Sequence, residues 1–108
     1  MKQVIEGKFV HTVMFWLKEA DNISVKTHFE TALNTMIKDS LYIKSVYLGS
    51  PAYTPRDIVD SSYTYCYIAT FDSKEDQDLY QTEEAHDVFR HAIDGLLDKI
   101  IIYDSIYL

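Results

Sequence analysis

Hydrophobic residues in four segments of the chain follow the patterns of β-strands. Positions 9–17 are apolar at nearly every residue and rich in Val, Phe and Trp, which is typical of a buried strand. Positions 63–71 alternate Tyr and Phe with smaller residues at a period of two. Two more strands are expected over 42–48, which is closed by Gly49-Ser50-Pro51, and over 99–107, which contains three consecutive isoleucines. The only long loop separates the second and third strands.

A long helix is predicted between the first two strands. Asp21 or Asn22 can cap its first turn, because both side chains can accept a hydrogen bond from a free backbone N–H. Apolar residues then recur at the three- and four-residue spacing of one helix face: Val25, Phe29, Ala32, Leu33, Met36 and Ile37.

A short helix and a longer one are predicted between the third and last strands. Ser73 can cap the short helix, which runs toward Tyr80, and Thr82 can cap the longer one. The negative charges of Glu83-Glu84 suit the positive first turn of the longer helix, and Gly95 lies near its end. Its apolar stripe consists of Ala85, Val88, Phe89, Ala92, Ile93, Leu96 and Leu97.

This order of elements, β-α-β-β-α-β, predicts the α+β ferredoxin-like fold, a four-stranded antiparallel sheet with its helices on one face. With 108 residues the chain has room for a single domain, residues 1–108. The first strand is also apolar on the side that the helices cannot cover, where Val10, Met14 and Trp16 lie. A second copy of the same sheet would cover that side most simply, so a two-fold homodimer is expected.

Composition and charge narrow the classes of partner. The net charge is −7 and no basic stripe is present, which argues against nucleic acid and anionic membranes as partners. No apolar run approaches the roughly 18 residues of a membrane span, and no signal peptide is recognised. The lone Cys66 permits no intrachain disulfide and is expected to be reduced and unreactive. These features predict a soluble, cytoplasmic protein.

His86 is the strongest candidate for a functional residue. On a helical wheel it falls between Ile93 and Leu97, inside the apolar stripe of the longer helix. An imidazole in that position loses hydration, so it needs a polar partner or a ligand. We therefore expect His86 in a partly enclosed pocket, within reach of Tyr80 or His11.

Several segments resemble the stress-responsive α/β-barrel (Dabb) domain family. The likeness spans about residues 9–107. It rests on the first strand, Phe9-Val10-His11-Thr12-Val13-Met14-Phe15-Trp16-Leu17-Lys18, on 65–73 leading into Tyr80, on Ala85-His86 with Phe89, and on the isoleucine-rich last strand. The resemblance implies a dimeric α+β barrel built from two ferredoxin-like sheets. It implies no single activity, because most members of the family have none assigned.

One plant member of the family, a polyketide cyclase, closes a linear chain by aldol condensation without cofactor or metal. Its catalytic histidine matches His86, its assisting tyrosine matches Tyr80, and a pocket histidine matches His11. By this resemblance, catalytic roles are expected for His86, Tyr80 and His11. The present sequence departs from the pattern at Glu83-Glu84, where many members have His-Pro, and at Leu33, where the cyclase has a tyrosine.

Each candidate also has a structural interpretation. His86 can be a hydrogen-bonded core histidine, and Tyr80 can simply end the short helix. The tyrosines at 63, 65 and 67 are expected on one face of their strand, where they can line an aromatic ligand cavity or fill the core or a dimer interface. A metal site from His11, Glu83 and His86 matches no known spacing and is not predicted, and three glycines make no phosphate-binding loop, so no cofactor is expected.

Three hypotheses for function follow. The first is a homodimer of unassigned biochemical role that binds a small hydrophobic or aromatic ligand between sheet and helices. The second is a cofactor-free enzyme, polyketide cyclase-like or monooxygenase-like, that uses a His/Tyr acid–base pair. The third is a purely structural stress protein. An open cavity beside His86 would favour the first two, and a filled core would favour the third.

Overall fold

A computed structural model describes all 108 residues and contains the predicted order of strands and helices. The elements are β1 (Phe9–Leu17), α1 (Ile23–Asp39), β2 (Ser45–Gly49), β3 (Tyr65–Phe71), α2 (Lys74–Gln81), α3 (Glu84–Ala92) and β4 (Leu97–Ile106). None of the helices is both long enough and apolar enough to cross a membrane.

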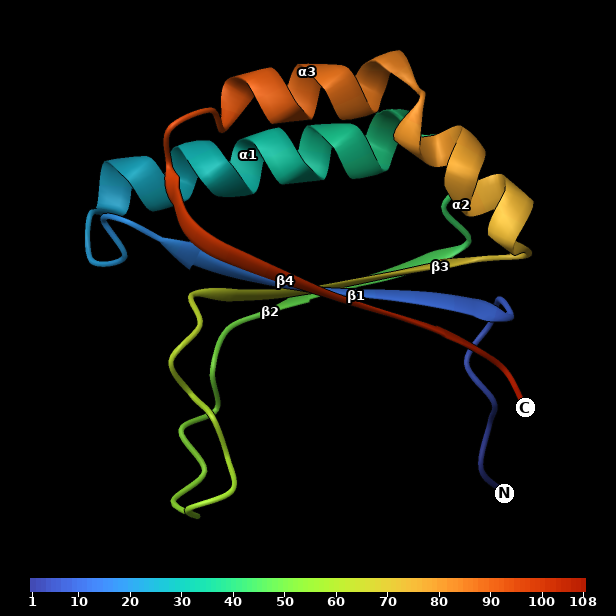
Figure 1. Ribbon diagram of the computed structural model, residues 1–108, viewed down its shortest axis with the longest axis horizontal. Helices are drawn as coiled ribbons and strands as arrows, with labels where there is room; N and C mark the ends of the chain where they lie inside the picture. Colours follow the sequence, from blue (N-terminus) through green and yellow to red (C-terminus); the bar gives the residue numbers. More distant parts are fainter.

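The four strands form one antiparallel sheet in the order β2-β3-β1-β4. β1 is central, and its Phe15 pairs with Tyr65 of β3 on one side and with Ile100 of β4 on the other. The helices α1 and α3 lie side by side over a single face of the sheet (Figure 1). This is the ferredoxin-like α+β arrangement, so the predicted fold class is confirmed.

The core lies between this sheet face and the helices, because every second residue of β1 points toward them. Phe29 of α1 is at its centre and is completely buried. Its ring lies 4.9 Å from the ring of Phe15, stacks on Tyr65 at 5.0 Å and meets Phe89 of α3 at 6.0 Å. These four aromatic rings join both long helices to the two central strands.

The opposite face of the sheet has no helix over it (Figure 1). Val10, Met14 and Trp16 of β1 lie on this outer face and are only half-buried. The indole N–H of Trp16 donates to Ser62 Oγ at 3.1 Å, and Lys99 Nζ lies 4.7 Å from the centre of the indole ring. The long loop and both chain ends project on this side of the sheet (Figure 1).

Some element boundaries and caps differ from the predictions. Asn22 caps α1 as expected, since its side chain accepts from the Val25 N–H. The prediction that Thr82 caps α3 is wrong: its hydroxyl donates to the Leu79 carbonyl and it ends α2 instead. Glu83 occupies the N-cap position of α3 without a side-chain hydrogen bond to that helix.

The third helix is also shorter than its apolar periodicity predicts. It ends at Ala92, and Gly95 with φ of 79° reverses the chain immediately afterwards, which is a backbone conformation that glycine adopts readily. Residues 96 and 97 therefore belong to the turn and to the start of β4. The second strand begins at Ser45 rather than at position 42, and the last begins at Leu97 rather than at position 99.

The aromatic cluster around Phe29 should dominate stability. We expect Phe29→Ala to lower the free energy of unfolding by about 3–5 kcal/mol, because the truncated side chain leaves a cavity between sheet and helices. Val88→Ala, at an exposed position of α3, should change it by about 0.5 kcal/mol or less. Urea unfolding of both variants measures the difference, and similar midpoints for the two would contradict this account of the core.

Candidate functional site

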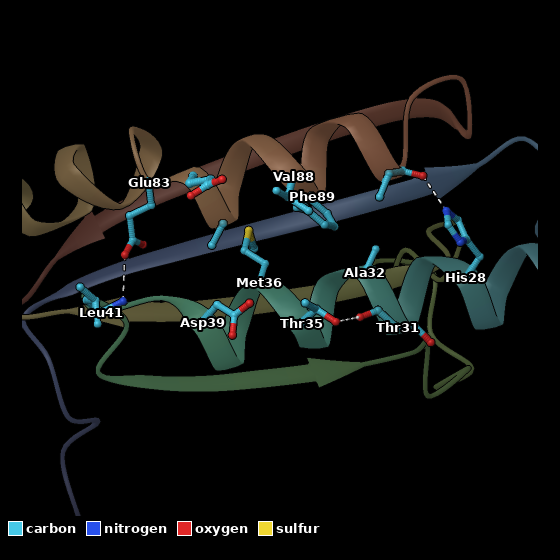
Figure 2. A pocket seen from close by; sticks show the side chains of 13 residues that line it. His28, Thr31, Ala32, Thr35, Met36, Asp39, Leu41, Glu83, Val88 and Phe89 are labelled. Carbon is cyan, nitrogen blue, oxygen red and sulfur yellow. Dashed lines mark hydrogen bonds between the residues drawn. The ribbon is translucent and has the colours of Figure 1, made fainter.

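Two large hollows adjoin α3, and the larger one lies between α1 and α3. Figure 2 shows the side chains that line it, and its volume is about 690 Å³. Two of its polar side chains are bonded within the protein: His28 Nε2 donates to the Ala92 carbonyl at 2.6 Å, and Glu83 accepts from the Leu41 N–H at 2.8 Å. The pairing of these groups within the protein makes this groove a weaker candidate site than the second hollow.

The second hollow lies between α3 and the strands β1 and β4, and it has a volume of about 510 Å³. It contains all three residues singled out in the sequence, His11, Tyr80 and His86. The other lining residues are mostly apolar: Val13, Phe15, Tyr67, Phe89, Arg90, Ile93, Asp94, Gly95, Leu97, Ile100 and Ile102. We call this hollow the α3–β4 pocket.

His86 lies in the first turns of α3 and faces the pocket. Its ring meets the Tyr80 ring edge to face, with centres 5.0 Å apart. Its Nδ1 atom is buried and has no hydrogen-bond partner in the protein. Burial lowers the pKa of His86, and the nearby Arg90 charge lowers it further, against an opposing effect of Asp87. The imidazole is therefore neutral at neutral pH and has an unpartnered polar atom next to the cavity that the residue lines.

His11 projects from the centre of β1 and is 7% exposed. Its Nδ1–H donates to Asp104 Oδ1 of β4 at 2.6 Å. The carboxylate can only accept, so the shared hydrogen lies on Nδ1. The ring of His11 is 6.1 Å from that of Tyr80. A histidine held in one orientation by a carboxylate thus adjoins the same pocket as His86.

Tyr80 lies beside His86 but does not hydrogen-bond to it. Its hydroxyl lies 3.1 Å from the hydroxyl of Tyr67 and donates to Met36 Sδ at 3.6 Å. Burial raises the pKa of Tyr80 to about 12 and raises the pKa of Tyr67 further still. Both phenols therefore stay protonated and can donate hydrogen bonds. The Met36 sulfur is a weak acceptor, so a ligand oxygen could replace it.

Asp104 was missed by sequence reasoning, as were Arg90 and Asp94. The isolated sequence places Asp104 93 residues from His11, and only the antiparallel register of β1 and β4 sets the two opposite each other. Alternation along the last strand could have suggested that Asp104 shares a face with Ile100 and Ile102, but not which residue of β1 it meets.

Glu83 and Tyr63 lie away from the pocket. The Glu83 carboxylate accepts from the Ser40 hydroxyl and the Leu41 N–H, and so joins the end of α1 to the start of α3. No group of three or more His, Cys, Asp or Glu side chains is arranged to hold a metal ion. Tyr63 precedes β3 and packs against Trp16, whereas Tyr65 and Tyr67 face the helices, so the prediction that all three share one face is wrong.

Comparison with protein families identifies the scaffold. The model of the stress-responsive A/B barrel domain, Dabb, matches residues 9–107. The chain belongs to the Dabb family. The resemblance noted in the sequence is therefore confirmed over residues 9–107, almost the whole chain. A comparison with curated proteins found no match.

Solved structures support the same Dabb fold. A hydroxynitrile lyase from Passiflora edulis is 17% identical, with a TM-score of 0.79 and 96% of each chain covered. A Dabb family protein from Mesorhizobium loti is 19% identical, with a TM-score of 0.75, 95% of this chain and 99% of that chain. A dimeric ferredoxin-like protein of unknown function from Thermobifida fusca is 15% identical, with a TM-score of 0.75, 97% of this chain and 96% of that chain. At these identities the likeness establishes a shared fold.

The environment of His86 predicts its titration. Because folding lowers its pKa, the folded Dabb domain binds this proton less readily than the unfolded chain, in which a histidine titrates near 6.5. The stability that depends on neutral His86 is complete above that pH and decreases as the pH falls through it, down to the lowered folded pKa. NMR titration of the imidazoles should place His86 below 6.5, and a value at or above 6.5 would contradict the buried geometry.

Proposed function

We propose that this protein acts as a homodimer in which each α3–β4 pocket binds a small, largely hydrophobic molecule beside His86. The single observation that carries the proposal is the buried, unpartnered Nδ1 of His86 in a cavity of about 510 Å³. Buried polar atoms in proteins almost always have a partner, so an unpartnered one on a side chain that lines a cavity suggests that a ligand or water supplies it. The cavity is within the size range of small-molecule sites.

The lining of the α3–β4 pocket supports a hydrophobic ligand with one polar group. Phe15, Phe89 and Ile93 give it apolar walls, and the histidines and tyrosines gather at one part of it. This separation is typical of sites where apolar contact supplies affinity and a few polar groups fix orientation. A ligand carbonyl or hydroxyl near His86 could accept from the Tyr80 hydroxyl in place of the weak Met36 sulfur.

The outer face of the sheet supports the homodimer. Val10, Met14 and Trp16 present apolar surface that no helix covers, and Tyr47 and Tyr103 are exposed on the neighbouring strands of this face. Such a surface on a sheet of this size is expected to pack against another molecule. Structural neighbours of the same fold from Thermobifida fusca and Bacteroides fragilis are described as dimeric, which agrees with a two-fold contact between these faces.

A second candidate function, cofactor-free acid–base catalysis, is favoured by the His11–Asp104 hydrogen bond. A neutral His86 could remove a proton next to a substrate carbonyl, while Tyr80 donates a hydrogen bond to the oxygen that becomes negative. His86 would then carry that proton and could return it at another position of the substrate, while the His11 ring, oriented by Asp104, could hydrogen-bond a polar group of the substrate. A cyclase-like or monooxygenase-like reaction would use these groups, and the similarity in fold to a hydroxynitrile lyase is compatible with catalysis on this scaffold.

Two measurements test the proposed dimer: the mass of the protein in solution and the effect of one substitution at the proposed interface. Light scattering at micromolar concentration should give twice the 12.6 kDa mass of a single chain. Trp16→Ala should shift the protein toward monomer, because a large buried aromatic contributes about 3–5 kcal/mol to such contacts. Leu79→Ala, on the exposed side of α2, serves as the control and should leave the dimer intact.

Cys66 gives the dimer test a second readout. It is half-buried, pairs with Met14 in the sheet and lies on the outer face, and burial raises the pKa of its thiol. Thiol labelling should be slow in the wild type and faster in Trp16→Ala at a concentration where that variant is monomeric. A wild-type monomer with rapidly labelled Cys66 would refute the proposed interface.

The pocket is tested by thermal shifts of three proteins: the wild type, His86→Ala and Tyr80→Phe. With a panel of aromatic ketones, phenols and acids, a ligand at 100 times its Kd should stabilise the wild type by about 2.7 kcal/mol. His86→Ala should fold normally yet lose this stabilisation, and Tyr80→Phe should keep part of it. For a catalysed substrate the same order should hold for turnover.

A structural role for His86 would reverse these results. In that case His86→Ala would melt clearly below the wild type, and no member of the panel would stabilise the wild type. That combination would exclude ligand binding as the role of this residue.

A further inference from the structure

The charged residues at the α3–β4 pocket bear on the charge of the ligand that it can bind. Arg90 is the only Lys or Arg among the lining residues, and Asp94 lies one turn further along, beside Gly95. Arg90 is already paired: its guanidinium donates to Asp87 Oδ1 at 2.5 Å. Asp94 lines the pocket and forms no ion pair within the chain.

A second carboxylate adjoins the pocket from the side of the sheet. Asp104 accepts from His11 through Oδ1, and its side chain is 42% exposed. The lysine nearest in sequence, Lys99, lies on the other side of the sheet, over the Trp16 ring. The pocket is thus bordered by Asp94 and Asp104 without an unpaired cationic side chain of lysine or arginine to offset them.

We propose that the α3–β4 pocket selects uncharged hydrophobic molecules and rejects their anionic counterparts. An anionic ligand would lose hydration on entering the apolar cavity and would meet the field of two carboxylates, and the charge of Arg90 is already partly offset by Asp87. An uncharged carbonyl or phenolic compound has none of these costs and can still reach the hydroxyl and imidazole groups. This inference rests on the proposed function and names the ligand class of that same site.

Two fluorescent probes with the same ring skeleton but different charge test this preference for uncharged ligands. N-phenyl-1-naphthylamine is uncharged, and 8-anilino-1-naphthalenesulfonate has the same ring skeleton with one sulfonate added. With the wild-type dimer in low salt, the uncharged probe should bind about tenfold more tightly than the sulfonate. Raising the salt to 1 M should reduce this ratio, because mobile ions screen charges near the surface.

Four variants test which residues cause the preference for the uncharged probe. Asp94→Asn should strengthen sulfonate binding about threefold and leave the uncharged probe unchanged. Asp87→Asn, which frees Arg90, should act in the same direction. Glu75→Gln, an equal change of charge on exposed α2, is the matched control and should alter neither affinity. Ile102→Trp, which fills the pocket from β4, should weaken both probes and so confirm where they bind.

The outcomes separate this inference from the function on which it rests. Uncharged and anionic probes that bind the wild type equally well, or tighter binding of the anion, would overturn the selection while leaving the pocket in place. Binding of neither probe, or binding that Ile102→Trp does not weaken, would overturn the proposed pocket and the selection with it.

Discussion

The structure depends on one strand that is hydrophobic on both of its faces. On its inner face β1 contributes Phe9, Val13 and Phe15 to the core, and on its outer face it carries residues that no helix reaches. The strand can only be central, because an edge position would leave too much of this surface in water. Its two neighbours, β3 and β4, are therefore fixed in register against it, and that register decides which side chains from distant parts of the chain meet.

The pocket is a consequence of how much of the sheet the helices cover. The inner residues of β1 and β3 are buried beneath α1 and α3, whereas Ile100 and Ile102 on the inner side of β4 remain 47% and 49% exposed. The early end of α3 and the reversal at Gly95 leave space above this edge strand. The apolar side chains of β4 therefore form a wall of a cavity instead of closing a core, and His86 faces that cavity from α3.

Much of the fold could be predicted from the sequence because it rests on periodic patterns. The doubly apolar first strand, the period of two in the third and the three-four spacing of α1 each identify an element without knowledge of its neighbours. Boundaries were less predictable where a local turn or cap overrides the pattern, as at Thr82 and Gly95. His86 could be singled out from its place in an apolar helix face, whereas catalytic roles for His86, Tyr80 and His11 together were suggested by the family resemblance. Asp104 could not, because its meeting with His11 depends on the register of strands that are distant in sequence.

Most polar side chains at the pocket already have a hydrogen-bond partner within the protein. His11 is held by Asp104, Tyr67 and Tyr80 are held by each other, and Arg90 is held by Asp87. The Nδ1 of His86 alone among the lining side chains is both buried and without a partner. An imidazole kept neutral by burial, with fixed donors around it, needs no rearrangement of the protein to accept a proton or a hydrogen bond from a bound molecule. The fold thus leaves an unsatisfied polar atom on a side chain that lines the pocket, where a ligand can complete it. The burial that lowers the pKa of His86 also keeps its imidazole neutral, so the ring has a lone pair available to a bound molecule.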